Sequence, residues 1–223
     1  MCINYTPPTR ADISELMKVR MDETSAWPAE TWQDYAAPIL CQPQANEPEL
    51  VVATYGMLPK RFLPPGKKNF TTLNARAETI GQKPAYANAW RRGQTCLVPM
   101  RSFREPNYES GRAAWWSIGM ADDAAFCVAG LWRAWEEAED GLSFSFTQIT
   151  INADEHALMR RFHKPADEKR SLVIVARSDY SAWLSCRDPV QARAMLSLYP
   201  AHAMQATPTT PAGATGMSTL PLF

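Results

Sequence analysis

The sequence predicts an α+β fold, with a single domain built on a mainly antiparallel, curved or barrel-like β-sheet and short flanking helices. Its 223 residues, 46% of them hydrophobic, are enough for one core of generous size. Strand-like runs outnumber helix-like ones, and they follow one another without the regular helical crossovers that a parallel sheet requires. We therefore expect residues 2–200 to form the domain and residues 201–223 to form a mostly irregular C-terminal tail, rich in small residues and proline.

Six segments are rich in apolar, β-branched or aromatic residues and are bounded by turn-like or charged residues, as strands are. They are residues 50–56, 95–100, 113–120, 124–132, 144–151 and 171–176. Two other stretches are interrupted by prolines and predict loops. These are residues 21–48 and the basic segment 57–70 (MLPKRFLPPGKKNF).

Helices are expected over residues 9–20, 84–93, 154–162, 178–186 and 188–199. Their ends carry the residues that usually begin or stop a helix. Asp12 with Glu15 as its return partner, Ser178 and Asp188 are the expected N-terminal caps. Gly93 is the expected stop of the second helix, because glycine readily adopts the left-handed conformation that follows a helix.

The composition excludes several classes of protein. The 23 basic and 23 acidic residues cancel, so any electrostatic attraction must come from local clusters. We find no signal peptide and no apolar stretch long enough to span a membrane. The five cysteines are odd in number and scattered, and the three histidines lack zinc-site spacing, so we expect neither disulfides, nor a metal, nor a cofactor. These features are typical of a reduced, cytoplasmic protein.

Three groups of polar residues lie within or beside apolar segments. Asn74, Arg76 and Glu78 alternate in TTLNARAETI and share one face if that segment is extended. Glu105 follows a strand-like run in CLVPMRSFREP, and His163 lies among basic residues in MRRFHKPADEKR. Each group also has a purely structural interpretation: a turn contact for the asparagine, a solvated loop carboxylate for the glutamate, and an ordinary hydrogen-bonded histidine.

Cys2 directly follows the initiator methionine. On position alone it is an ordinary residue near a frayed chain end, since termini tolerate change. Removal of Met1 would instead place a free α-amine beside the thiol, and this 1,2-aminothiol is unavailable to an internal cysteine. The amine has an ordinary pKa near ~7.7–8.0, so part of it is neutral and nucleophilic at neutral pH.

These residues belong to an ordered series of motifs that resembles the SRAP family, the SOS response-associated peptidase domain that shields abasic sites in single-stranded DNA. Cys2 matches the family's cysteine after the initiator methionine, and LNARAET looks like its most characteristic motif. CLVPMRSFREP is similar to the segment that carries the family glutamate, which aligns Glu105, and His163 falls on the family histidine. Further matches in the same order are YAAP (35–38), YGMLP (55–59), AGLW (129–132) and FTQITINAD (146–154).

The resemblance implies an enzyme with lyase-like DNA–protein crosslinking activity. Cys2 would form a thiazolidine with the aldehyde of an abasic site, first through its amine and then through its thiol. Ring closure is intramolecular, and such reactions reach effective molarities of ~10⁵ M or more. Glu105 is the implied general acid/base, Asn74 would orient the amine or the sugar, and His163 would donate a proton to the opened sugar or a phosphate.

The implied partner is single-stranded DNA that contains abasic sites, bound by a monomer that joins the nucleoid during DNA damage. Arg76 suits a phosphate because its planar guanidinium matches oxyanions. A basic track would consist of Arg160, Arg161, Lys164, Lys67 and Lys68. Phe62 or Phe70 would stack on bases that flank the lesion.

Three alternatives remain open from the sequence. The first is a cysteine peptidase, acting on peptides or on its own N-terminus, with Cys2 as nucleophile and His163 or Glu105 as base. The second is a non-covalent single-stranded DNA-binding module with an inert cysteine, and the third is a sheet-rich interaction domain. The chain also departs from the family pattern: Ile3-Asn4 replaces Gly-Arg, and residues 166–170 (ADEKR) are additional.

Overall fold

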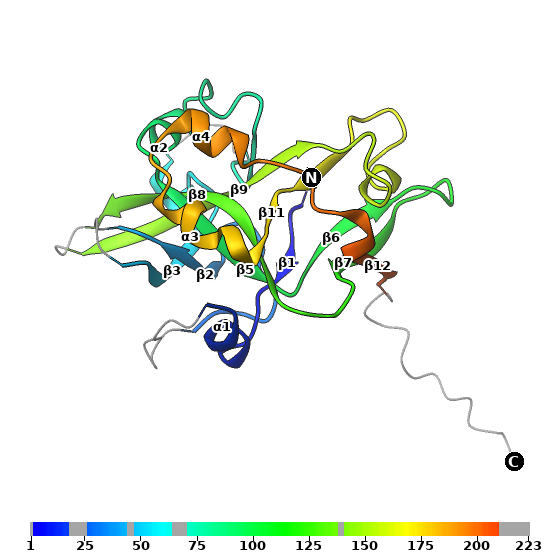
Figure 1. Cartoon of the computed structure of the whole chain (residues 1–223), viewed down its shortest axis with the longest axis horizontal. Helices are drawn as coiled ribbons and strands as arrows, with labels where there is room; N and C mark the ends of the chain where they lie inside the picture. Colours follow the sequence, from blue (N-terminus) through cyan, green and yellow to red (C-terminus); the bar gives the residue numbers. More distant parts are fainter. Residues whose placement is uncertain (1, 18–25, 44–46, 64–70, 138–140, 210–223) are drawn as a thin grey trace, which may run out of the picture.

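The computed structural model describes residues 2–17, 26–43, 47–63, 71–137 and 141–209, which form two β-sheets with short helices around them (Figure 1). The larger sheet contains β2 (Ala36–Cys41), β3 (Glu49–Tyr55), β4 (Asn74–Arg76), β5 (Thr95–Met100), β8 (Phe126–Glu136), β9 (Leu142–Asn152), β10 (Arg170–Leu172) and β11 (Ile174–Val175). Its order is β10-β9-β3-β2-β5-β8-β11, with β4 beside β9. An additional pairing of β8 with β9 closes five of these strands into a barrel.

The smaller sheet is antiparallel and contains β1 (Tyr5–Thr6), β6 (Ser102–Asn107), β7 (Ala114–Met120) and β12 (Met204–Pro208), in that order. Arg101 alone separates β5 from β6, so one nearly continuous segment passes from the barrel into this sheet. The 3-10 turn η4 (Ala201–Ala203) leads into β12, which pairs along β7. Residues 201–208 are therefore ordered, unlike the mostly irregular tail that we expected from residue 201.

This architecture confirms the predicted fold class: a single domain on a mainly antiparallel, barrel-like sheet with short helices. The exceptions to antiparallel pairing are β3 and β4, which both run parallel to β9. Each of the six predicted strand segments overlaps a strand, and residues 171–176 overlap two. In the described parts of the chain, no helix combines the length and the apolar character that crossing a membrane requires.

β2 lies in a segment that we expected to be a loop because of its prolines. It pairs with β3 along its whole length, but its pairing with β5 covers only Leu40 and Cys41. Continuing that register would place Pro38 opposite Pro99 of β5, and neither residue has an N–H for the ladder. The two prolines thus allow β2 and β5 to separate at the end of the barrel where β5 continues into the smaller sheet.

The core joins the barrel to the smaller sheet through buried aromatic rings. Tyr55 of β3 stacks on Phe146 of β9, with ring centroids 5.2 Å apart, and Tyr5 of β1 packs edge-on against Tyr55 at 5.4 Å. On the other side of β5, α3 (Tyr180–Ser185) is held by Trp183, whose indole N–H donates to the Cys96 carbonyl at 2.8 Å.

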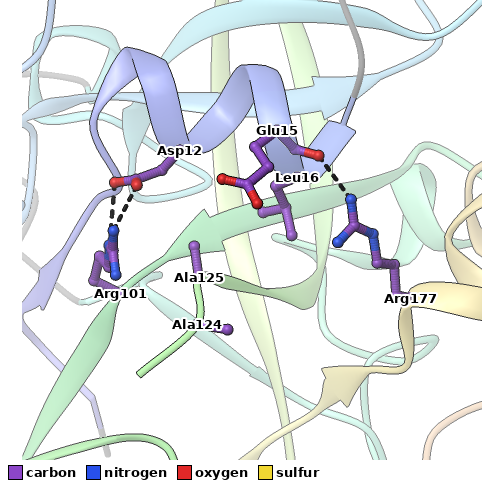
Figure 2. A pocket seen from close by; sticks show the side chains of 7 residues that line it. All are labelled: Asp12, Glu15, Leu16, Arg101, Ala124, Ala125 and Arg177. Carbon is purple, nitrogen blue, oxygen red and sulfur yellow. Dashed lines mark hydrogen bonds and ion pairs between the residues drawn. The ribbon is translucent and has the colours of Figure 1, made fainter. Parts of the chain in front are cut away.

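α1 (Arg10–Met17) begins with a capping box that differs from the predicted pair. The Thr9 hydroxyl accepts from the N–H of Asp12, and the Asp12 carboxylate accepts from the N–H of Thr9 at 2.9 Å. Thr9 is therefore the cap, with Asp12 as its return partner. Arg101 pairs with Asp12, and Arg177 donates to the Glu15 carbonyl at 2.7 Å. Figure 2 shows these arginines holding the helix from two sides of a small polar pocket.

Three further helices are shorter than their sequence patterns predicted. α2 (Ala87–Arg91) ends just before Gly93, as expected, and the φ of 61° at that glycine suits a residue without a side chain. α4 (Pro189–Ala194) has the predicted cap, since the Asp188 carboxylate accepts from the N–H of Val190 at 2.9 Å. α3 follows a 3-10 turn and is preceded by Asp179 rather than by the expected Ser178.

The helix predicted over residues 154–162 is wrong, because this segment contains only the 3-10 turn η2 (Met159–Arg161). Nδ1 of His156 accepts from the N–H groups of Leu158 and Met159, which competes with helical hydrogen bonds. Nε2 of the same ring lies 2.8 Å from the Tyr199 carbonyl, so the loop is also tied to the segment before η4.

Gly130 of β8 lies where the neighbouring strands leave no room for a Cβ atom. An added Cβ would lie 2.6 Å from the Thr147 carbonyl oxygen and 2.8 Å from Sγ of Cys96. We expect Gly130→Ala to lower the free energy of unfolding by about 1–3 kcal/mol, measured by urea denaturation. Gly141→Ala is the matched control, because the structure places no described atom within 4 Å of its added Cβ. Equal stability of the two variants would contradict the close contact at Gly130.

Three buried thiols of the barrel make stability sensitive to alkaline pH. Burial raises the pKa of Cys41, Cys96 and Cys127, the last to about 12, from an ordinary 9.0. Their contribution is complete below the unfolded pKa and is lost as pH rises toward the folded values, because the unfolded chain ionises first. Between pH 8 and 10 we expect the free energy of unfolding to fall by about 1.4 kcal/mol per thiol.

Urea titrations at the two pH values measure this loss of stability. Cys127→Ala removes one of these thiols, so it should reduce the loss of stability between the two pH values by about 1.4 kcal/mol. A pH dependence that is the same in this variant and in the wild type would show that Cys127 ionises alike in the folded and unfolded chains.

Candidate active site

The backbone of the first described residues is held against the smaller sheet. The N–H of Arg104 donates to the Asn4 carbonyl at 3.1 Å, which extends the β1–β6 pairing by one residue. The Asn4 side-chain amide donates to the Thr31 carbonyl at 3.3 Å. Cys2 and Asn4 are fully or almost fully buried, whereas Ile3 between them is 40% exposed. The described start of the chain is therefore part of the core and not a frayed end.

The carbonyl oxygen of Cys2 is held by polar side chains from the barrel. Nδ2 of Asn74 donates to it at 2.6 Å, and the hydroxyl of Tyr55 lies 3.2 Å away. The same hydroxyl lies 3.0 Å from Oε1 of Gln148, so its single proton serves one of two acceptors at a time. Asn74 reaches this position because β4 pairs in parallel with β9, which places it opposite Gln148.

The Cys2 thiol is fully buried and donates to the Asn4 carbonyl at 3.2 Å. Burial raises the pKa of the Cys2 thiol well above its ordinary value, and the negative charge of Glu105 raises it further. The sulfur is therefore protonated at neutral pH. Any reaction in which it forms a bond needs a base to accept that proton.

Glu105 and His163 come together from β6 and from the loop after η2. Nε2 of His163 lies 3.1 Å from Oε2 of Glu105, and both side chains are buried. The loop is held along β6, because the N–H of His163 donates to the Pro106 carbonyl at 2.9 Å and Asn107 forms a β-bridge with Phe162. Glu105 is thus a buried strand residue rather than a solvated loop carboxylate.

This centre combines an unusual backbone conformation with buried polar atoms that lack a hydrogen-bond partner among the described residues. His163 has a φ of 67°, a left-handed conformation that is uncommon outside glycine and often found at functional sites. Oδ1 of Asn74 and Nδ1 of His163 are buried without a hydrogen-bond partner among the described residues. Such an atom costs about 1–3 kcal/mol, which a ligand that supplies the bond would recover. The described residues contain no group of three His, Cys, Asp or Glu side chains placed to hold a metal.

Asn74 also lines an open groove of about 630 Å³, which we call the β4 groove. Arg76 lines it too, two residues further along the same strand, as the alternation of this segment predicted. Lys83 and Arg133 add two more positive charges, and none of the described lining residues is acidic. The lining is completed by Leu58, Thr71, Thr72, Thr79, Pro84, Ala85 and Tyr86.

Other residues that the sequence singled out are not among the described residues that line this groove. Glu78 does not line it, and it binds Arg170 through two hydrogen bonds of 2.9 Å. Phe62 stacks on Trp135, with ring centroids 4.1 Å apart. Lys67, Lys68 and Phe70 lie outside the described residues.

The three basic residues near His163 are not part of the described groove lining. Arg161 is bound by both carboxylate oxygens of Glu109, at 2.9 and 3.0 Å, and lies over the ring of Trp116. Arg160 and Lys164 are exposed to solvent. The structure therefore brings together Cys2, Asn74, Glu105 and His163, with Arg76 in the adjoining groove, and leaves these three cations outside the described groove lining.

Sequence reasoning missed four residues of this region: Tyr55, Gln148, Lys83 and Arg133. The available signal for Gln148 was a polar amide inside the apolar run FTQITI, and Tyr55 lies in the YGMLP motif. Lys83 and Arg133 gave no signal, because isolated cations are common on protein surfaces and folding alone brings these two to one groove.

The fold occurs in solved structures. A protein from Bordetella bronchiseptica superposes with a TM-score of 0.82 at 29% identity, over 94% of this chain and 100% of that chain. A protein from Bacteroides thetaiotaomicron superposes with a TM-score of 0.74 over 94% of this chain and 93% of that chain. The second is 18% identical, so it supports the fold alone.

The sequence is also similar to proteins of Bacillus subtilis (strain 168). The abasic site processing protein YobE is 29% identical over 158 residues, which are 68% of each chain. The abasic site processing protein YoaM is 29% identical over 158 residues, 68% of this chain and 66% of its own. The model of the SOS response associated peptidase (SRAP) family matches residues 1–212. The match spans almost the whole chain, and the protein therefore belongs to the SRAP family.

Proposed function

We propose that this protein recognises abasic sites in single-stranded DNA and, once Met1 is removed, crosslinks to them covalently through Cys2. The observation that carries the proposal is the position of Cys2, which Asn74 fixes beside the β4 groove, with the charge of Glu105 acting on its thiol. Membership of the SRAP family and the names of the relatives from Bacillus subtilis support an action on abasic sites.

The chemistry joins an aldehyde, an amine and a thiol. The open-chain form of an abasic sugar carries the aldehyde at C1′, and the α-amine of Cys2 adds to it. The resulting carbinolamine loses water to give an imine. The sulfur then bonds to the imine carbon while the thiol proton passes to the nitrogen, so one water leaves for each thiazolidine formed. Both nucleophiles belong to a residue whose carbonyl is already held, which favours ring closure.

Glu105 is the general acid/base of this scheme. It is buried away from bulk water and lies close enough to the Cys2 thiol to raise the pKa of that group. It would protonate the departing hydroxyl during dehydration and accept the thiol proton during ring closure. His163, in contact with Glu105, would donate to the opened sugar or a phosphate, and Oδ1 of Asn74 would accept from the released amine or the sugar.

The DNA strand would follow the β4 groove, where Arg76, Lys83 and Arg133 supply positive charge. Binding of phosphates by such residues releases counterions, so affinity should fall with salt. We place the additional backbone contacts predicted from the sequence at Arg160, Arg161, Lys164, Lys67 and Lys68. A protein with this activity would act as a monomer in the cytoplasm, at the nucleoid during DNA damage and the SOS response.

A conventional cysteine peptidase agrees less well with the geometry. A thiol nucleophile is activated by a lowered pKa, whereas burial and the charge of Glu105 raise the pKa of Cys2. We therefore confine any hydrolytic role of Cys2 to autoproteolysis at the N-terminus, which would expose the amine that the crosslink needs.

The first test mixes the Met-processed protein with a single-stranded oligonucleotide that carries one abasic site. A shifted band on a denaturing gel should require the abasic site, and intact mass spectrometry should show the sum of protein and DNA minus one water. Cys2→Ala should abolish the stable band, because an imine formed by its amine has no thiol to close the ring. Cys41→Ala is the matched control, since this thiol belongs to an internal buried strand residue.

Each other outcome of this experiment points to a different function. Absence of the band despite confirmed removal of Met1 would contradict the proposal. Salt-sensitive binding without the band would indicate a non-covalent DNA-binding module, and cleavage of a peptide panel would indicate a peptidase.

The second test concerns the acid/base role of Glu105. Glu105→Gln should slow crosslink formation by about 10²-fold or more, because general acid/base catalysis contributes about 10²–10⁴-fold. Its Kd for the same strand without an abasic site should change little. Glu155→Gln is the matched control, because this carboxylate is exposed and belongs to none of the residues assigned to the site. A larger loss of DNA binding than of crosslinking rate would remove Glu105 from the catalytic role.

A further inference from the structure

Arg76 lines the β4 groove, but its guanidinium is already paired with an acid. Its Nη1 lies 2.7 Å from Oε2 of Glu168, and both side chains are partly exposed. Glu168 is not among the described lining residues of the groove, so its carboxylate approaches Arg76 from the groove's edge. A carboxylate and a phosphate make the same kind of charge-assisted bond to a guanidinium. Glu168 therefore occupies the guanidinium that binds a DNA phosphate under the proposed function.

The carboxylate of Glu168 is itself held in place. Its other oxygen, Oε1, accepts from Nη1 of Arg170 at 2.7 Å and from Nδ2 of Asn152 at 3.1 Å. The hydrogen bond from Arg170, followed by that from Asn152, lowers the pKa of the Glu168 carboxyl, so the group is ionised at neutral pH. One oxygen is thus anchored, and the second is presented to Arg76.

The strand order explains how this acid reaches Arg76. β4 and β10 both pair with β9, so Arg76 and Leu172 are both register partners of Thr150. These two strands therefore lie on opposite edges of β9, and Glu168, just before β10, reaches Arg76 across the end of β9, where Asn152 also donates to its carboxylate. Hydrogen bonds at Lys169 hold the chain at this point: its N–H donates to the Asp154 carboxylate and its carbonyl accepts from the N–H of Ala153, each at 2.8 Å.

We propose that Glu168 is a specificity-determining residue of the β4 groove, which occupies Arg76 in the DNA-free protein and must be displaced by a backbone phosphate. This inference rests on the proposed DNA-binding function. The free-energy cost of displacing Glu168 weakens non-covalent binding, so a single strand without an abasic site is held weakly. A strand with an abasic site is retained because the covalent bond at Cys2 does not depend on that equilibrium.

The exchange has a signature in the salt dependence of binding. In the wild type, a phosphate that binds Arg76 replaces a carboxylate, so this contact releases few counterions. In Glu168→Gln the guanidinium is open to counterions, which a bound phosphate then releases. The slope of log K against log salt should therefore be steeper than in the wild type by about 0.7, the value for one phosphate of a single strand. At low salt the Kd should fall by about two- to fivefold, the range for an exposed ion pair.

The test measures fluorescence anisotropy of a labelled single-stranded oligonucleotide without an abasic site, over a series of salt concentrations. Glu168→Gln keeps an Oε1 acceptor for Arg170 and Asn152. Glu155→Gln is the matched control, because it removes an equal charge from an exposed residue that is not the partner of Arg76. The double variant Arg76→Ala/Glu168→Gln is compared with Arg76→Ala alone, and thermal unfolding checks that all variants are folded.

The expected result is tighter binding and a steeper salt slope for Glu168→Gln, with neither change in Glu155→Gln nor in the Arg76→Ala background. Tighter binding that persists without Arg76 would show general charge repulsion and would overturn the proposal. Weaker or unchanged binding would overturn it too, because Glu168 would then position Arg76 or have no effect on it. Crosslinking of the wild type to an abasic site distinguishes failure of the proposed function from failure of this inference. Absence of the crosslink rejects the proposed function. Presence of the crosslink, with DNA binding unchanged in Glu168→Gln, rejects this inference alone.

Discussion

The antiparallel pairing of β1 with β6 is the constraint on which the rest of the site depends. It is short, but the hydrogen bond from Arg104 to Asn4 extends it and the bridge from Tyr5 to Thr31 holds its other side. Tyr5 then reaches the aromatic core of the barrel. A chain start that is usually frayed is thereby buried, and the carbonyl of Cys2 comes within reach of Asn74. Without this pairing, Cys2 would not lie between Asn74 on β4 and Glu105 on β6.

The second requirement is that polar side chains meet at the junction of the two sheets. The prolines of β2 and β5 end the ladder between these strands, and β5 continues through Arg101 into β6. This route carries Glu105 out of the barrel and toward His163, whose loop is held along β6 by its own backbone. Buried polar atoms there cost stability unless they are bonded, so the junction combines a rigid frame with unfilled hydrogen-bonding capacity.

The zero net charge of the chain conceals how its charges are distributed. Many arginines are neutralised locally by acids, as Arg161 is by Glu109 and Arg170 is by Glu78. The described lining of the β4 groove has no acid, so it keeps a local positive potential. Arg76 belongs to both patterns, because it lines the groove and pairs with an acid at its edge. Neutral overall charge is therefore compatible with a surface that binds an anionic strand.

The sequence by itself determined six of the strand segments, the fold class and the order of the motifs, because apolar runs and turn residues act locally. It also singled out Cys2, Asn74, Glu105 and His163 through that order. It could not show β2, since Pro38 indicates a loop until the partner strand that tolerates it is known. Only the tertiary structure decided that Tyr55 and Asn74 meet at the Cys2 carbonyl, or that Glu168 pairs with Arg76. These contacts join residues far apart in the chain, and strand register rather than local propensity sets their distances.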